Sequence, residues 1–180
     1  MLYMFLAQGF EEVEAIATLD VIRRAGISIE SVGIGALNVT GSHNITVVCD
    51  KTESEISFNE NVEGIILPGG MPGTTNLMNS KTVSDFIDSC HANGRLLCAI
   101  CAAPMILGRK GLLHGKEAIC FPGFENELKG AVIADAYVCR DENIITSKGM
   151  GSAVNFGLEI VAALTDRQTA DKLKSTLQCS

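Results

Sequence analysis

The sequence predicts a doubly wound α/β sandwich, in which helices cover both faces of a parallel sheet. Short apolar runs of strand length alternate along the chain with longer segments of helical periodicity. The short runs are apolar at every position, as is typical of parallel strands that are buried on both faces. With 180 residues, 47% of them hydrophobic, the chain is long enough to bury a core as a single domain over residues 1–180.

The first third of the chain begins with a strand and a helix. Residues 2–7 form a continuous apolar run, and residues 11–25 carry acidic side chains in the first turn and basic ones in the last. This charge pattern favours a helix, which Gly26 would end. A second strand is expected over residues 27–34, and a small side hairpin is expected around residues 46–49.

The rest of the chain continues the alternation. Residues 64–67 form a short apolar run that ends at Pro68-Gly69-Gly70, and Ser80 is a suitable N-cap for the next helix. We expect this helix to end at residues 93–94. Further strands are expected over residues 96–100, 117–119, 136–139 and 144–147, and further helices over residues 103–109, 152–164 and 169–177.

Composition narrows the classes of function. A net charge of −7 argues against a nucleic-acid or membrane-surface protein, because both usually present a basic face. No stretch approaches the roughly 20 apolar residues that span a bilayer. Seven cysteines without a framework spacing favour reduced thiols and a cytoplasmic location. We expect no cofactor, because nucleotide-binding glycine patterns are missing, and no zinc, because neither Cys120 nor His114 supplies a close-spaced ligand pair.

Three strand ends bring chemically useful groups to one edge of the predicted sheet. Ligands of open parallel sheets bind beyond the carboxyl ends of the strands. The first strand leads to Glu14, and the apolar run over residues 64–67 leads to Gly69 and Gly70. The run over residues 96–100 leads directly to Cys101. A carboxyl group, two unhindered backbone amides and a thiol are therefore expected together, and this edge is the candidate site.

Cys101 stands where a strand turns abruptly into a helix and is followed by small residues. Such an elbow directs the N-terminus of the next helix at the thiol, so we expect the pKa of Cys101 to be lowered. The alternative is a buried structural cysteine. A disulfide with Cys98 is excluded, because extended chain separates the two residues by roughly 10 Å and a disulfide needs Cα atoms within about 7 Å.

The early acids allow two interpretations. Glu11 and Glu12 fit as first-turn partners of the helix dipole. Glu14 lies deeper, and a carboxyl group under the sheet edge would have a raised pKa and could donate a hydrogen bond to the thiolate. An ordinary surface acid is the alternative for Glu14, and spacing alone does not separate the two.

The glycine turn also has two interpretations. Gly69 and Gly70 would let a ligand approach main-chain N–H groups, and both are candidate backbone donors to an oxyanion. Together with the amide of Ala102, the Gly70 amide could stabilise an oxyanion formed when Cys101 attacks a carbonyl. The alternative is a simple Pro-Gly-Gly turn.

Three segments carry a resemblance to a known family, namely Leu6-Ala7-Gln8-Gly9-Phe10-Glu11-Glu12-Val13-Glu14, Leu67-Pro68-Gly69-Gly70 and Ala99-Ile100-Cys101-Ala102-Ala103-Pro104. In order and content they resemble the motifs of the ThiJ/PfpI superfamily, and more narrowly of its DJ-one/ThiJ branch; residues 20–26 and 146–151 also match. The resemblance implies a flavodoxin-like, class I glutamine amidotransferase-like domain that usually forms homodimers. It also implies that Cys101 is an oxidation-sensitive nucleophile, that Glu14 is a protonated carboxyl holding its thiolate, and that Gly70 and Ala102 are backbone donors.

The activities that the resemblance implies concern reactive aldehydes and stress. They are the cofactor-free conversion of methylglyoxal or glyoxal to hydroxy acids (glyoxalase III) and the repair of glyoxal adducts on proteins (deglycase). Oxidative stress protection through cysteine oxidation and a holdase-like chaperone activity are also attributed to the branch. The partner implied is thus a small aldehyde or a glycated protein.

Four positions depart from the family pattern. Peptidases of the family carry His directly after the nucleophile, where this chain has Ala102, so peptidase activity is not expected. Some members of the near branch place His before a proline, where this chain has Phe121, which cannot move a proton. Lys148 and Met150 replace an arginine and a proline of the late motif.

Two functions from different classes follow. In the first, the protein is an enzyme in which Cys101 adds to the aldehyde of a small α-oxoaldehyde and Glu14 moves the proton. In the second, it is a non-enzymatic redox sensor or chaperone that uses oxidation of Cys101. Both need the same thiolate, and Phe121 slightly favours the second.

Overall fold

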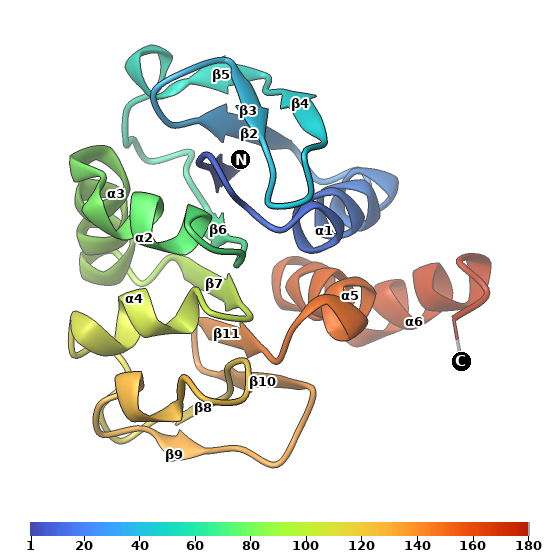
Figure 1. The fold of residues 1–180 in the computed structure, drawn as a ribbon. Coiled ribbons are helices and arrows are strands. Elements are labelled where there is room, and N and C mark those ends of the chain that lie inside the picture. The colour runs from blue at the N-terminus through green and yellow to red at the C-terminus, as the bar shows by residue number, and fades with distance from the viewer. Residues whose placement is uncertain (180) are drawn as a thin grey trace.

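A seven-stranded sheet runs through the computed structural model, which describes residues 1–179 (Figure 1). Neighbouring strands are parallel except at one edge, where β10 runs antiparallel to β11. In spatial order the strands are β10 (Val138–Asp141), β11 (Ile144–Ser147), β7 (Leu96–Ile100), β6 (Gly64–Leu67), β1 (Leu2–Leu6), β2 (Ile29–Gly33) and β5 (Lys51–Thr52). Two small pairs lie outside this sheet, β3 (Asn38–Thr40) with β4 (Thr46–Val48) and β8 (Glu117–Ala118) with β9 (Val132–Ile133).

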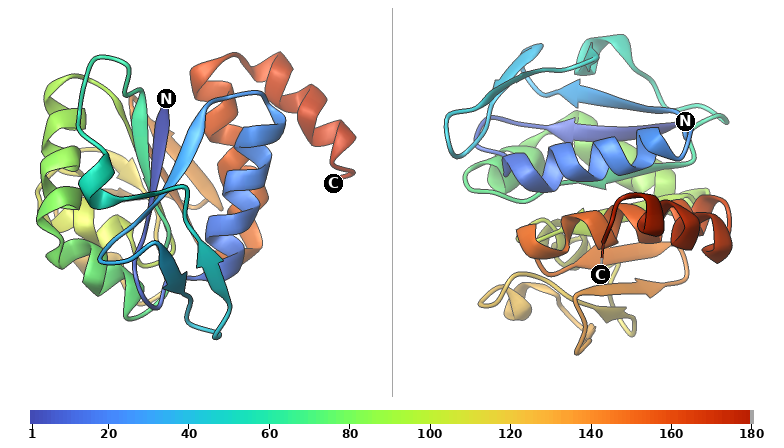
Figure 2. Two further views of the ribbon diagram at one scale, coloured as in Figure 1. Left: turned by 90° about the horizontal axis from the view of Figure 1, so that it is seen from above. Right: turned by 90° about the vertical axis from the view of Figure 1, so that its right-hand side faces the viewer.

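Helices cover both faces of the sheet (Figures 1 and 2). On one face α1 (Glu12–Arg24) packs against α5 (Ala153–Leu164), which in turn packs against α6 (Arg167–Thr176). The other face carries α2 (Gly73–Asn79), α3 (Lys81–Ala92) and α4 (Pro104–Arg109). Short 3₁₀ turns occur at Glu53–Glu55, Glu125–Glu127 and Met150–Ser152. None of the described helices is long and apolar enough to cross a membrane.

The sheet divides the hydrophobic core into two clusters. Side chains of a strand alternate between the two faces of a sheet. In β1, Leu2, Met4 and Leu6 therefore pack on the α1 and α5 side, while Tyr3 and Phe5 pack on the opposite side. Every residue of β1 is buried, which explains why its sequence is apolar throughout rather than alternating.

These observations confirm the predicted doubly wound sandwich, but several elements differ from those expected. The short strands β5 and β9 were not expected, and β8 pairs with β9 outside the main sheet. The helix α2 was not expected, because Gly73, two threonines and two asparagines leave it few apolar positions from which to recognise a helix. The sheet is also not wholly parallel, since the last hairpin adds β10 as an antiparallel edge strand. The predicted cap is confirmed, because the Ser80 hydroxyl accepts a hydrogen bond from the Val83 N–H at 3.3 Å.

Candidate active site

Cys101 occupies the predicted elbow directly after β7. Its φ angle of +64° lies in the left-handed region, which a residue with a side chain seldom adopts. Two backbone hydrogen bonds hold this conformation: the Cys101 N–H donates to the Ser147 carbonyl at 2.9 Å, and the Cys101 carbonyl accepts from the Phe121 N–H at 2.8 Å. The sharp turn leaves Cys101 partly exposed, whereas Cys98 within the strand is fully buried. All seven cysteines are free.

Glu14 is buried beside this thiol, with only 1% of its surface exposed. Its Oε2 accepts a hydrogen bond from the Gly69 N–H at 2.8 Å, while Oε1 has no hydrogen-bond partner among residues 1–179. The carboxyl group is positioned by the helix N-terminus, where the Glu11 side chain caps α1 by accepting from the Glu14 N–H at 2.7 Å. The interpretation of Glu14 as a surface acid is therefore wrong.

Burial changes the acidity of both groups. It raises the pKa of Glu14 to about 7, although the neighbouring Cys101 thiol and the Gly69 N–H oppose the rise. It also raises the pKa of Cys101 to about 12, helped by the negative charge of Glu14. The expected net lowering of the Cys101 pKa is thus wrong. The N–H groups of Ala102 and Gly70 do lower this pKa, but burial and Glu14 outweigh them.

The thiol and the carboxyl group consequently titrate as a pair. Above about pH 7 the pair carries one negative charge and retains one proton. When that proton resides on Glu14, Cys101 is a thiolate that faces two backbone N–H groups. Whether Cys101 is a thiol or a thiolate in this pair therefore depends on which of the two groups holds the remaining proton.

The glycine turn contributes in two different ways. The Gly69 N–H is used by Glu14, so Gly69 is a positioning residue and the expectation that it is an oxyanion donor is wrong. A Cβ at Gly69 would lie 2.6 Å from the Cys101 Cβ and 2.8 Å from Glu14 Oε2, which excludes a side chain there. Gly70 has a φ angle of +86°, and its N–H, with that of Ala102, acts on the sulfur.

Glu12 stands in the first turn of α1, as expected, but it also makes a contact that was not expected. It is buried, and its Oε1 accepts from the His43 N–H at 2.6 Å while its Oε2 lies 3.0 Å from His43 Nδ1. One ligand atom each of Glu11, Glu12 and His43 lie within 4.8 Å of one another. Because His43 follows Glu12 by 31 residues and precedes no motif, nothing in the sequence indicated this contact.

A cleft of about 380 Å³ opens next to Glu14. It is lined by Phe121, Pro122, Tyr137, Lys148, Gly149, Met150, Gly151 and Ser152. A Cβ built on Gly149 would lie 3.3 Å from the Phe121 ring and 3.9 Å from Glu14 Oε1, so the absence of a side chain leaves the space between the cleft and the carboxyl group open. No histidine is among the lining residues, which agrees with the departure noted at Phe121.

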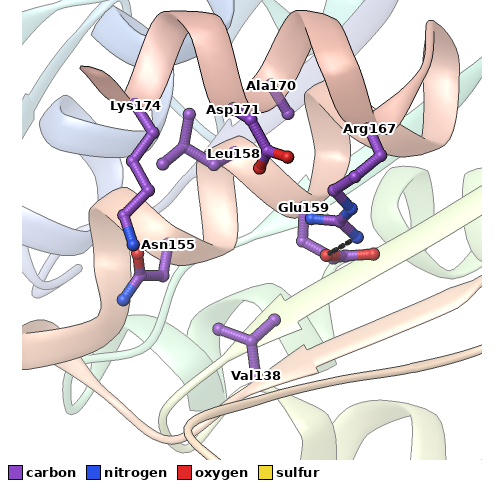
Figure 3. A pocket seen from close by; sticks show the side chains of 8 residues that line it. All are labelled: Val138, Asn155, Leu158, Glu159, Arg167, Ala170, Asp171 and Lys174. Atoms are coloured by element: carbon purple, nitrogen blue, oxygen red, sulfur yellow. Dashed lines mark hydrogen bonds and ion pairs between the residues drawn. The ribbon is translucent and has the colours of Figure 1, made fainter. Parts of the chain in front are cut away.

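A second cavity, of about 290 Å³, lies between β10, α5 and α6 (Figure 3). Its charged side chains include Arg167 and Glu159, which form an ion pair at 2.6 Å. Its lining residues come from β10, α5 and α6 and include neither Cys101 nor Glu14.

Known proteins share this architecture and much of the sequence. Residues 1–163 match the model of the DJ-1/PfpI family. The chain is 32% identical to protein dj-1beta of Drosophila melanogaster over 97% of its own length and 94% of the relative. It is similar to oxidised DJ-1 of Toxoplasma gondii, with a TM-score of 0.94 and 31% identity over 99% and 98% of the two chains. A cysteine-to-alanine mutant of a DJ-1 superfamily protein from Salmonella typhimurium gives a TM-score of 0.93 at 34% identity, over 99% and 98% of the two chains.

Proposed function

The chain belongs to the DJ-1/PfpI family and has its flavodoxin-like fold, and we propose that it is a cysteine-dependent, cofactor-independent enzyme of the glyoxalase III or deglycase type. Its substrates would be methylglyoxal, glyoxal or their adducts on proteins. The observation that carries the proposal is the buried Glu14 carboxyl, whose Oε1 lacks a hydrogen-bond partner among residues 1–179 beside the partly exposed thiol of Cys101.

The reaction needs no external oxidant. The Cys101 sulfur attacks the aldehyde carbon of R–CO–CHO, and the hemithioacetal oxygen is stabilised by the N–H groups of Gly70 and Ala102. Glu14 gives the shared proton to the hemithioacetal oxygen, and its carboxylate then removes the proton from the former aldehyde carbon and returns it to the neighbouring carbon through an enediol, which leaves a thioester. Water hydrolyses the thioester to R–CHOH–COOH and frees the thiol. The aldehyde carbon is oxidised to a carboxyl group while the neighbouring ketone carbon is reduced to an alcohol. Atoms and electrons therefore balance with one added water.

The pKa of Glu14 suits this role. A general acid–base group works best when its pKa lies near the operating pH. Burial brings the pKa of Glu14 to about 7, so both protonation states are populated near neutrality. A solvated glutamate, with a pKa of about 4.3, would be almost entirely ionised there.

Redox sensing or chaperone activity is the second candidate. It is favoured by Phe121, which stands where a histidine could have assisted proton transfer. One similar protein, DJ-1 of Toxoplasma gondii, has been solved in an oxidised form. In this role a peroxide would oxidise the Cys101 thiolate to sulfenic and then sulfinic acid, each step transferring one oxygen and releasing the reduced peroxide.

The two candidates are separated by the product. We expect purified protein to convert methylglyoxal to lactate, and Cys101→Ser and Glu14→Gln to lose at least about 100-fold of that rate, as is usual for a nucleophile and a general base. Lactate must be measured directly, because thiols also trap aldehydes reversibly. Loss of methylglyoxal without lactate would reject the enzyme and leave redox sensing as the function.

We also propose a cytoplasmic homodimer. Three apolar side chains are exposed together, namely Val13 and Ile16 on α1 and Ile45 beside β4. All three line one shallow groove. A second copy of the chain would cover this surface, which we call the α1 face. The cytoplasmic location is supported by the seven free thiols, which an oxidising compartment would not preserve.

A further inference from the structure

We propose that the cleft lined by Phe121, Tyr137 and Met150 binds an aromatic or bulky apolar substituent of the molecule that reacts with Cys101. The preferred substrate would then be an α-oxoaldehyde with a large apolar group, or an adduct that carries one, rather than methylglyoxal. For turnover this inference rests on the proposed function, but binding in the cleft can be tested without it.

The three largest uncharged side chains that line the cleft are those of Phe121, Tyr137 and Met150, and all three are exposed. Phe121 retains 47%, Met150 54% and Tyr137 70% of its surface in contact with solvent. Pro122 extends the apolar wall, and Lys148 lies over the Tyr137 ring with its Nζ 5.4 Å from the ring centroid. Clustered exposed apolar side chains around a concavity are typical of a ligand site.

The two segments that line the cleft, at Phe121 and after Ser147, are hydrogen-bonded to the backbone of Cys101. The Phe121 N–H donates to the Cys101 carbonyl, and the Ser147 carbonyl, immediately before Lys148 and Gly149, accepts from the Cys101 N–H. The cleft is therefore held in a defined position relative to the sulfur. A substituent on a carbon bonded to that sulfur would have a binding surface within reach.

Hydrogen bonds also hold the segment of residues 147–152, which forms one wall of the cleft. The Ser152 hydroxyl lies 2.7 Å from the Ser147 hydroxyl and donates to the Gly149 carbonyl at 2.8 Å. These contacts fix the 3₁₀ turn at Met150–Ser152. Because the backbone of this turn is held in place, little backbone entropy would be lost when a ligand enters the cleft.

Gly149 provides the opening between the cleft and the reacting groups. Any side chain there would stand between the Phe121 ring and Glu14 Oε1, at 3.3 Å and 3.9 Å respectively. The volume of about 380 Å³ lies in the range of small-molecule pockets, and the methyl group of methylglyoxal would leave most of it empty. Shape and polarity thus favour a planar apolar substituent.

The test compares two alkylating reagents that differ in one phenyl group, iodoacetamide and iodoacetanilide. Each forms a carbon–sulfur bond to Cys101 and releases iodide, so the intrinsic reactivity of the thiolate largely cancels in the ratio of their rates. Peptide mass spectrometry measures the rate at Cys101, and glutathione supplies the ratio for a thiol without a cleft. We expect the wild-type ratio to exceed the glutathione ratio at least about tenfold, since an apolar contact of this size gives selectivity of that order.

Three variants assign the selectivity to the cleft. Phe121→Ala removes the wall, and Gly149→Ala narrows the opening; Gly149 has an extended backbone, so alanine introduces no left-handed strain. Both should reduce the ratio about tenfold. Val132→Ala removes an exposed apolar side chain of β9 outside the cleft and should leave the ratio unchanged. A wild-type ratio equal to that of glutathione, or a ratio insensitive to both cleft variants, overturns the inference.

Turnover is measured in parallel as mandelate from phenylglyoxal and lactate from methylglyoxal. We expect kcat/KM to favour phenylglyoxal, with the preference reduced in Phe121→Ala. If neither hydroxy acid forms but the reagent ratio behaves as expected, the proposed enzyme fails while the cleft stands as a binding site. If both acids form with no preference and the reagent ratio is flat, the enzyme stands and the cleft inference fails.

Discussion

At the scale of single residues, we propose that Cys101 and Glu14 share one proton and that this proton determines when the thiol reacts. Each group alone would be a poor acid in this environment, because burial disfavours its charged form. As a pair, the thiol and the carboxyl group can lose one proton near neutrality. The remaining proton is then held by one group or the other. The N–H groups of Gly70 and Ala102 then stabilise negative charge on the sulfur.

We expect Cys101 alkylation by iodoacetamide to rise with pH through an apparent pKa near 7, where the pair loses its first proton. Glu14→Gln removes the shared proton, so the buried thiol must ionise alone, and the rise should move above the free-thiol value of about 8.5. Mass spectrometry of the Cys101 peptide between pH 5 and 10 gives both profiles. Superimposable profiles would show that Glu14 does not control the thiol.

At the scale of secondary-structure elements, Glu12 joins the start of α1 to the loop between β3 and β4. Its buried carboxylate accepts hydrogen bonds from the His43 backbone and ring. Although burial alone would raise the pKa of Glu12, these bonds lower it, and the same contact raises the pKa of His43. The α1 N-terminus that carries Glu14 is thereby connected to the hairpin.

This contact predicts a pH-dependent contribution to stability. Because the folded-state pKa of His43 is raised, its contribution is fully present below the unfolded value of about 6.5 and is lost as pH rises through the folded value. His43→Gln should therefore lower the Tm more at pH 5.5 than at pH 8.5, as measured by calorimetry. His91→Gln, which removes a histidine without an ion pair among residues 1–179, is the control. An equal decrease in Tm at both pH values for His43→Gln would contradict the prediction.

At the scale of the whole molecule, we propose that a second copy of the chain packs on the α1 face. The chain carries a net charge of −7, so association has to overcome repulsion and would depend on apolar contact. Ile16 is 43% exposed and Ile45 is 54% exposed. Their positions on α1 and beside β4 make a continuous surface from two separate segments.

We expect sedimentation equilibrium to give a dimer of the 19.1 kDa chain. Ile16→Glu should shift the mass to that of the monomer, because an unpaired charge would be buried in the interface. Val132→Glu places the same charge on another exposed apolar position, in β9 and away from the α1 face, and the dimer should persist. A wild-type monomer, or dissociation by both variants alike, would reject this interface.

Local sequence was sufficient for most elements and for the position of the nucleophile. Continuous apolar runs identified β1, β6 and β7, because strands buried on both faces leave no polar position. The same reasoning failed for α2, which has few apolar side chains, and for the direction of β10, which depends on a hairpin at the sheet edge.

The sequence by itself determined the fold class, the elbow at Cys101 and the meeting of Glu14, the glycine turn and the thiol at one edge of the sheet. Only the tertiary structure decided that Gly69 positions Glu14, that Glu12 binds His43, and that the Cys101 pKa is raised rather than lowered. The physical reason is that periodicity and helix ends are local properties, whereas desolvation and the approach of charges depend on residues distant in sequence. The cleft beside Gly149 also depends on the tertiary structure, because residues 121–122, 137 and 148–152 come together only in the folded chain.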